Sequence, residues 1–267
     1  MKSFILGILM LSCAHRSEPL KVSSWGIQLQ GYEKNDSLKK IQNSEKDLWV
    51  IDPDSFTSSM VRTLRKKPKK IIAYLSLGEA EGYRDYFKSL PQDLLIEENP
   101  QWKDNFTVKF WDERWKKVVQ ESLQRIQKKG FDGVFLDVID AFDRFPDKET
   151  KARAMGELIE MVAQEARKTD PGFLVIMQNG LHIRRLLSDP QTLLASISAV
   201  NAENVYDSQD AELLSDLAFY RQAGKLILGL EYLKLEKDKA NYIDFAHKQD
   251  ILPLILDESL DGTGSAY

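Results

Sequence analysis

Short apolar segments alternate with longer mixed segments along the chain from about residue 23 onward. Most of the short segments are continuously apolar and rich in β-branched and aromatic residues, as in "KLILGLEYL" and "DGVFLDVID", which is typical of strands buried on both faces. The predicted strands cover residues 23–31, 48–54, 70–81, 132–140, 173–180, 199–206, 225–233 and 251–259.

Helical patterns lie between these strands. In residues 111–126, apolar side chains such as Trp115, Val119 and Leu123 recur on one face, and Gly130 provides the stop signal. Residues 152–166, 208–223 and 237–249 show similar patterns. Strand–helix alternation with eight strands predicts an α/β fold, a single-domain (β/α)₈ TIM barrel. A doubly wound open sheet is the alternative, but the first predicted strand lacks the glycine-rich phosphate loop of that fold.

The two ends of the chain differ from this pattern. Residues 1–13, "MKSFILGILMLSC", have a lysine followed by a short apolar run, which predicts a signal peptide. Cys13, the only cysteine, stands where a bacterial lipoprotein box has its lipidated residue, so we expect lipidation there. Secretion without an anchor and a cytosolic location are the alternatives. Residues 14–22 are a predicted linker and residues 23–267 the barrel, whose last outer helix is expected to be missing or replaced.

Composition narrows the function. The chain is 43% hydrophobic with a net charge of −4, which favours a globular domain and argues against nucleic-acid binding. We expect an exported monomer, either a lipoprotein at the outer surface or in the periplasm or a secreted protein. It would touch a membrane only through a lipid anchor. His182 is the one histidine near a predicted strand end, and no GxSxG motif accompanies it.

Polar residues gather at the predicted carboxyl ends of the strands, which form the active-site rim of such a barrel. They are mostly acids and amides: Gln30, Asp52, Asp54, Glu79, Glu81, Asp137, Asp140, Gln178, Asn179, Glu203, Asn204, Glu231 and Asp257. Asp and Asn are also ordinary helix caps, but Glu203 and Glu231 fit that explanation poorly. Carboxylates and amides without thiols favour glycoside hydrolysis. A magnesium site formed by Asp137, Asp140 and Glu203 is an alternative.

The stretch of residues 82–111 adds aromatic side chains next to this rim, and Tyr83 and Tyr86 are candidates to stack on sugar rings. The ordered segments "SWGIQLQGY", "WVIDPD", "IIAYLSLGEAEGYRDYF", "GFDGVFLDVIDAF", "QNG" and "NAENVY" resemble the endo-α-1,4-polygalactosaminidase family of secreted TIM-barrel glycosidases. The resemblance spans residues 23–259. It implies a catalytic aspartate after the fourth strand, at Asp137, and a catalytic glutamate at Glu203. It also implies a substrate exopolysaccharide that contains α-1,4-linked galactosamine.

On this basis Asp137 is the predicted nucleophile and Glu203 the acid/base of a retaining mechanism, although the reverse assignment stays open. Retention requires the two carboxyl groups to lie ~5–5.5 Å apart. The predicted substrate contacts are Asp52, Tyr74, Glu79, Arg84, Asp140, Gln178, Asn179 and Glu231. An acidic rim would attract a cationic amino sugar. No metal or other cofactor is predicted. The rival functions are a non-catalytic carbohydrate-binding lipoprotein and a metal-dependent hydrolase on the same fold.

Overall fold

The computed structural model describes residues 20–32, 36–67, 69–256 and 260, so the predicted signal peptide with Cys13 and most of the predicted linker lie outside the described residues. Within the described part, eight parallel strands form one sheet in the order β1-β2-β3-β7-β8-β9-β10-β11. Their bounds are Trp25–Gln28, Leu48–Ile51, Lys70–Ser76, Gly133–Asp137, Leu174–Gln178, Ala199–Glu203, Leu226–Glu231 and Ile251–Ile255. Each of the eight predicted segments contains one of these strands.

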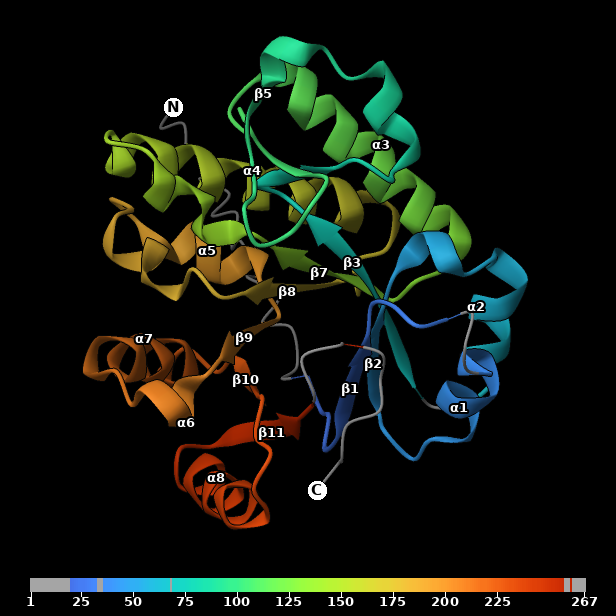
Figure 1. The fold of residues 1–267 in the computed structure, drawn as a ribbon, viewed down its shortest axis with the longest axis vertical. Helices are drawn as coiled ribbons and strands as arrows, with labels where there is room; N and C mark the ends of the chain where they lie inside the picture. The colour runs from blue at the N-terminus through green and yellow to red at the C-terminus, as the bar shows by residue number, and fades with distance from the viewer. Residues whose placement is uncertain (1–19, 33–35, 68, 257–259, 261–267) are drawn as a thin grey trace, which may run out of the picture.

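The sheet curls into a nearly closed barrel (Figure 1). The first and last strands of the sheet order meet, because the indole Nε1 of Trp25 in β1 donates to the carbonyl oxygen of Leu252 in β11 at 3.0 Å. The carbonyl oxygen of Leu260 also accepts a hydrogen bond from the backbone N–H of Leu29 at 2.9 Å. The predicted single-domain TIM barrel is therefore confirmed.

The helices lie around the outside of the strands (Figure 1). They are α1 (Ser37–Asn43), α2 (Ser58–Leu64), α3 (Glu113–Lys129), α4 (Lys148–Thr169), α5 (Pro190–Ser196), α6 (Val205–Ser208), α7 (Ala211–Gln222) and α8 (Glu236–Lys248). The four predicted helices correspond to α3, α4, α7 and α8. In the described residues no helix follows β11, and none is long and apolar enough to cross a membrane.

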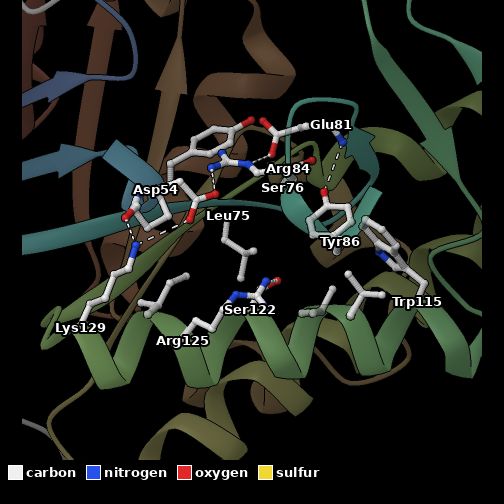
Figure 2. A pocket seen from close by; sticks show the side chains of 15 residues that line it. Asp54, Leu75, Ser76, Glu81, Arg84, Tyr86, Trp115, Ser122, Arg125 and Lys129 are labelled. Atoms are coloured by element: carbon white, nitrogen blue, oxygen red, sulfur yellow. Dashed lines mark hydrogen bonds and ion pairs between the residues drawn. The ribbon is translucent and has the colours of Figure 1, made fainter. Parts of the chain in front are cut away.

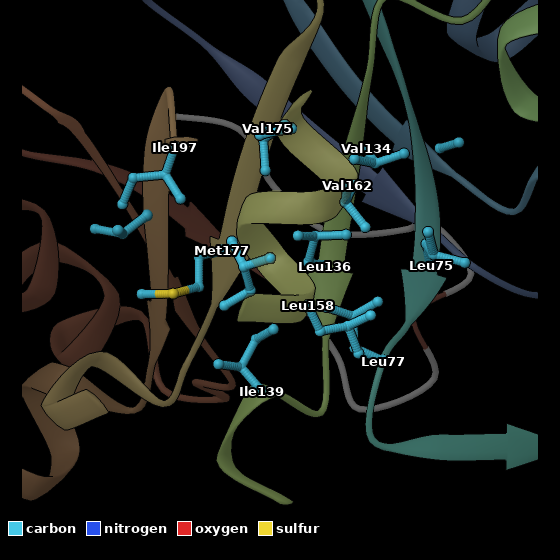
Figure 3. Close-up of a cluster of buried hydrophobic side chains, with 14 of the residues drawn as sticks. Leu75, Leu77, Val134, Leu136, Ile139, Leu158, Val162, Val175, Met177 and Ile197 are labelled. Carbon is cyan, nitrogen blue, oxygen red and sulfur yellow. The ribbon is translucent and has the colours of Figure 1, made fainter. Parts of the chain in front are cut away.

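The core has two layers, because alternate residues of a strand point to opposite faces. The side chains that fill the barrel include Trp25, Val50, Ile72, Phe135, Ile176, Leu228 and Leu254. The intervening residues pack outward against the helices. Figure 3 shows this outer layer, in which Leu136 and Met177 of the sheet face Leu158 and Val162 of α4. This alternation of inward and outward side chains, called strand parity below, decides which polar residues reach the barrel mouth.

A second sheet lies in the long connection between β3 and α3. Its strands are β4 (Glu79–Glu81), β5 (Leu95–Glu98) and β6 (Asn105–Val108), which pair antiparallel in the order β4-β6-β5. The predicted continuous strand 70–81 is therefore wrong beyond Ser76. The chain turns at Gly78, where an added Cβ would lie 2.4 Å from the carbonyl oxygen of Val138, so only glycine fits beside the loop after β7.

Candidate active site

Strand parity brings one set of polar side chains to the carboxyl end of the barrel interior. Tyr74 and Phe135 belong to the interior layer, and so do Ile176 and Ala199. The residues that continue this parity to the strand ends are Asp52, Ser76, Asp137, Gln178, Asn201 and Glu203. The predicted catalytic pair, Asp137 and Glu203, thus ends β7 and β9 on the same inner face of the sheet, and β8 separates the two strands.

Two protein groups hold the Asp137 carboxylate. The Tyr74 hydroxyl donates to Oδ2 at 2.9 Å, and the backbone N–H of Val138 donates to Oδ1 at 2.8 Å. Burial raises the pKa of Asp137 to about 7, and the negative charge of Glu203 adds to this rise, although the two hydrogen bonds oppose it. Asp137 is therefore poised to exchange a proton near neutral pH.

Two further groups hold Glu203. The Tyr232 hydroxyl donates to Oε1 at 2.7 Å, and the Asn179 amide Nδ2 donates to Oε2 at 2.9 Å. The Asn179 oxygen in turn accepts the backbone N–H of Glu203 at 3.1 Å. The sequence reasoning missed Tyr232, although strand parity could have found it, because Tyr232 continues the inward series of Leu228 and Leu230.

A left-handed backbone residue follows each of three neighbouring strands at the rim. These residues are Val138 (φ 56°), Asn179 (φ 54°) and Asn204 (φ 56°). Each turns the chain directly out of the sheet and into η4 (Ile139–Arg144), η5 (Leu181–Arg185) or α6. Asparagine tolerates this conformation, but a β-branched valine is strained in it. The strain therefore lies in the residue that follows Asp137 and donates to its carboxylate.

Arg84 ties the other side of the rim together. Its guanidinium group binds three carboxylates, those of Asp52 (2.7 Å), Asp54 (2.8 Å) and Glu81 (2.8 Å). The guanidinium carbon lies 4.8 Å from the centre of the Tyr83 ring and 6.0 Å from that of Tyr74. Figure 2 shows this cluster opposite α3. The predicted substrate contacts Asp52 and Arg84 thus bind each other, and Arg84 packs against the tyrosine that contacts Asp137.

The two tyrosines predicted to stack on sugars differ in position. Tyr83 is 64% exposed, and its hydroxyl donates to the Glu81 carboxylate. Tyr86 lines a small pocket between β3 and α3, where its ring meets Trp115 edge to face at 5.7 Å (Figure 2). Its hydroxyl accepts the backbone N–H of Glu81 at 3.2 Å. Of the two, Tyr83 is the one whose side chain is largely exposed.

Of three other predicted substrate contacts, two are enclosed by protein and one is exposed. Glu79 binds Arg144 (2.6 Å) and Asn99 (2.8 Å), which joins the second sheet to η4. Gln178 accepts a hydrogen bond from the amide of Asn201 inside the barrel. Asp140, in contrast, is exposed at the start of η4.

Glu231 does not lie in the barrel mouth, contrary to the sequence prediction. It follows Leu230, which points into the barrel, so its own side chain points outward and is fully buried. The backbone N–H of Tyr206 in α6 donates to its Oε1 at 2.7 Å. Burial raises the pKa of Glu231 to about 7. Its contacts hold α6 against β10.

No group of three or more His, Cys, Asp or Glu side chains among the described residues is arranged to hold a metal ion. The residues of the alternative magnesium site, Asp137, Asp140 and Glu203, are not such a group.

Comparison with solved structures supports the fold. Ega3 from Aspergillus fumigatus, solved in complex with galactosamine, matches with a TM-score of 0.78 at 17% identity, over 94% of this chain and 98% of that chain. The glycoside hydrolase domain of PelA from Pseudomonas aeruginosa matches with a TM-score of 0.73 at 19% identity, over 92% of this chain and 98% of that chain.

Sequence relatives span most of the chain. An uncharacterized protein of Deinococcus radiodurans is 31% identical over 257 residues, which is 90% of this chain and 82% of that protein. One from Thermotoga maritima is 31% identical over 236 residues, which is 81% of this chain and 68% of that protein. A family model matches residues 11–267, so the family resemblance indicated by the sequence motifs is confirmed. The chain belongs to glycoside-hydrolase family GH114.

Proposed function

We propose that this protein hydrolyses an exopolysaccharide containing α-1,4-linked galactosamine, with Asp137 and Glu203 as the catalytic pair. The observation that carries the proposal is this pair, which ends β7 and β9 on the inner face of the barrel. Each carboxylate accepts one tyrosine hydroxyl and one second donor, and burial, together with the charge of Glu203, raises the pKa of Asp137. Two coupled carboxylates are what glycoside hydrolysis requires.

The electrostatics favour Asp137 as the general acid, the reverse of the role expected from the sequence. A general acid needs a raised pKa so that it still holds a proton near neutral pH. The pKa of Asp137 is raised to about 7. In the retaining mechanism that we propose, Asp137 donates its proton to the leaving oxygen while Glu203 attacks the anomeric carbon. Asp137 then removes a proton from the water that releases the sugar from Glu203.

The galactosamine substrate has two supports. The similar fold of Ega3 was solved with galactosamine bound. The rim of this chain is also rich in carboxylates. Burial raises the pKa of Asp137, and the nearby charges of Glu203 and Asp140 add to that rise. A deacetylated amino sugar is cationic, so a negative rim raises its local concentration. We also propose that the protein is exported through residues 1–13 and anchored at Cys13, as the sequence pattern indicates.

The test is hydrolysis of galactosamine oligomers by Asp137→Asn and Glu203→Gln. Loss of either acid–base or nucleophilic function should lower the rate by about 10²–10⁴-fold or more. The matched control is Glu165→Gln on α4, which removes a carboxylate paired with Lys168 on the outer helix layer. Circular dichroism checks folding. Near-normal turnover by either folded variant removes that residue from the mechanism. Binding of oligomers without hydrolysis by the unsubstituted protein would favour the carbohydrate-binding alternative.

A further inference from the structure

A surface cleft of about 410 Å³ opens beside the catalytic pair. Its walls come from the loops after β7 and β8 and from the first turns of α7. Asp140 and Asn179 line it, and Asn179 is the residue that donates to the Glu203 carboxylate. The cleft therefore includes a direct neighbour of a proposed catalytic side chain, and η5 contributes to its lining.

The walls of the cleft are polar and fixed in position. Arg185 binds Glu212 at 2.7 Å and Asp216 at 3.0 Å. Asp216 is 2% exposed, and it also binds Arg184 at 2.6 Å. His182 of the same helix η5 packs against Phe142 with ring centres 5.1 Å apart. These contacts preform the cleft, so a ligand would not have to order it.

The charge of the lining is negative. The lining contains two cationic side chains, Lys148 and Arg185, and four carboxylates, those of Asp140, Asp210, Glu212 and Asp216. Glu212 is the most accessible of the paired acids, because its side chain is 74% exposed while that of Asp216 is 2% exposed. Asp140 and Asp210 are exposed as well, so three carboxylates of the cleft are open to a cation from solvent.

We propose that this cleft is an extended substrate subsite, which binds the cationic sugar units on one side of the bond that is cut. The inference rests on the proposed function and deepens it, because it assigns chain-length preference to named residues. The volume lies within the range of 300–1,000 Å³ that is usual for small-molecule sites. Carboxylates such as Glu212 bind the ammonium groups of the chain, and the fixed polar side chains around them bind its hydroxyl groups.

The test measures hydrolysis of purified galactosamine oligomers of increasing length by the unsubstituted protein and by Glu212→Gln and Glu212→Lys. An exposed charge pair contributes up to about 1 kcal/mol, which is a factor of about five in affinity. The ratio of kcat/KM for long oligomers to that for short ones should fall about fivefold in Glu212→Gln and further in Glu212→Lys. The change should lie in KM, and N-acetylated long oligomers should not show it, because they carry no charge.

The matched control is Glu236→Gln. Glu236 lies in the first turn of α8, just as Glu212 lies in the first turn of α7. The Glu236 side chain is 80% exposed and pairs with Lys239 at 2.6 Å. This control should keep the length dependence of the unsubstituted protein. An unchanged ratio in the folded Glu212→Lys protein, or an equal loss for short and long oligomers, would overturn the subsite alone. Failure of the unsubstituted protein to cut any galactosamine oligomer would overturn the proposed function and the subsite with it.

Discussion

Removal of the Tyr74 hydroxyl should shift the pH dependence of hydrolysis. Tyr74 donates to Asp137 Oδ2 at 2.9 Å, and this hydrogen bond stabilises the ionised form of Asp137. Tyr74→Phe keeps the ring that packs beside Arg84 and deletes only the donor. The backbone N–H of Val138 remains bound to the other carboxylate oxygen. The pKa of Asp137 should therefore rise from its value of about 7.

The size of the shift follows from the lost hydrogen bond. A hydrogen bond to a charged group contributes about 1.5–3 kcal/mol, and about 1.4 kcal/mol corresponds to one pKa unit. Asp137 is only half-buried at the barrel mouth, so water replaces part of the lost interaction. We therefore expect the low end of the range, a rise of about one unit. If Asp137 is the general acid, activity falls as pH rises through its pKa, and this alkaline limb should move from about 7 to about 8.

The assay is kcat/KM for a soluble galactosamine oligomer across the pH range in which the protein stays folded, because this parameter reports the free enzyme. Tyr220→Phe is the control, since it also loses a buried hydroxyl, one that donates to the Leu181 carbonyl oxygen at 3.0 Å. Its alkaline limb should stay in place. A limb unmoved in Tyr74→Phe would show that Asp137 is not the titrating group. An acidic limb that moves instead would return Asp137 to the role of nucleophile.

Three further predictions concern stability and location. Gly78→Ala should destabilise the fold by about 1–3 kcal/mol in urea unfolding, because its Cβ would lie 2.4 Å from the Val138 carbonyl oxygen; unchanged stability would contradict this packing. The pKa of buried Glu231 is raised from 4.5 to about 7, so its contribution to stability should fall by up to about 3 kcal/mol as pH rises through this range. Urea unfolding of Glu231→Gln should show a correspondingly weaker pH dependence, and an unaltered one would be inconsistent with the shift. Cys13→Ser should release the protein from membranes or block its processing, which fractionation measures; unchanged membrane association would argue against lipidation.

The fold and the placement of Asp137 and Glu203 at the ends of their strands could be predicted because both depend on local pattern. A strand buried on both faces needs a continuous apolar run, and eight such runs with helices between them leave few architectures. A carboxylate at the end of such a run, as at Asp137, stands out because an apolar strand needs no charged side chain for its packing. The same logic identified Glu203, which is a poor helix cap.

The roles of the other rim residues could not be predicted, because they depend on which face of a strand each residue occupies. A continuous apolar run does not show which of its residues point into the barrel. Glu231 and Glu203 therefore look alike in sequence, although the Glu231 side chain is buried between the strands and the outer helices. The position of Arg84 between Asp52 and Asp54 joins segments about 30 residues apart, and no local pattern reports such a contact. These placements require the three-dimensional structure.

Val138 connects the strain in the backbone with the chemistry of the site. A left-handed conformation costs an L-residue about 1–2 kcal/mol, and a branched side chain makes it worse. The conformation is held in place from the far side, where Gly78 has no side chain and lets the Val138 carbonyl oxygen approach closely. In return, the Val138 N–H is directed at Asp137 Oδ1, which fixes that carboxylate at the mouth of the barrel. The left-handed turn at Val138 thus accompanies the hydrogen bond that orients the carboxylate of the proposed catalytic residue Asp137.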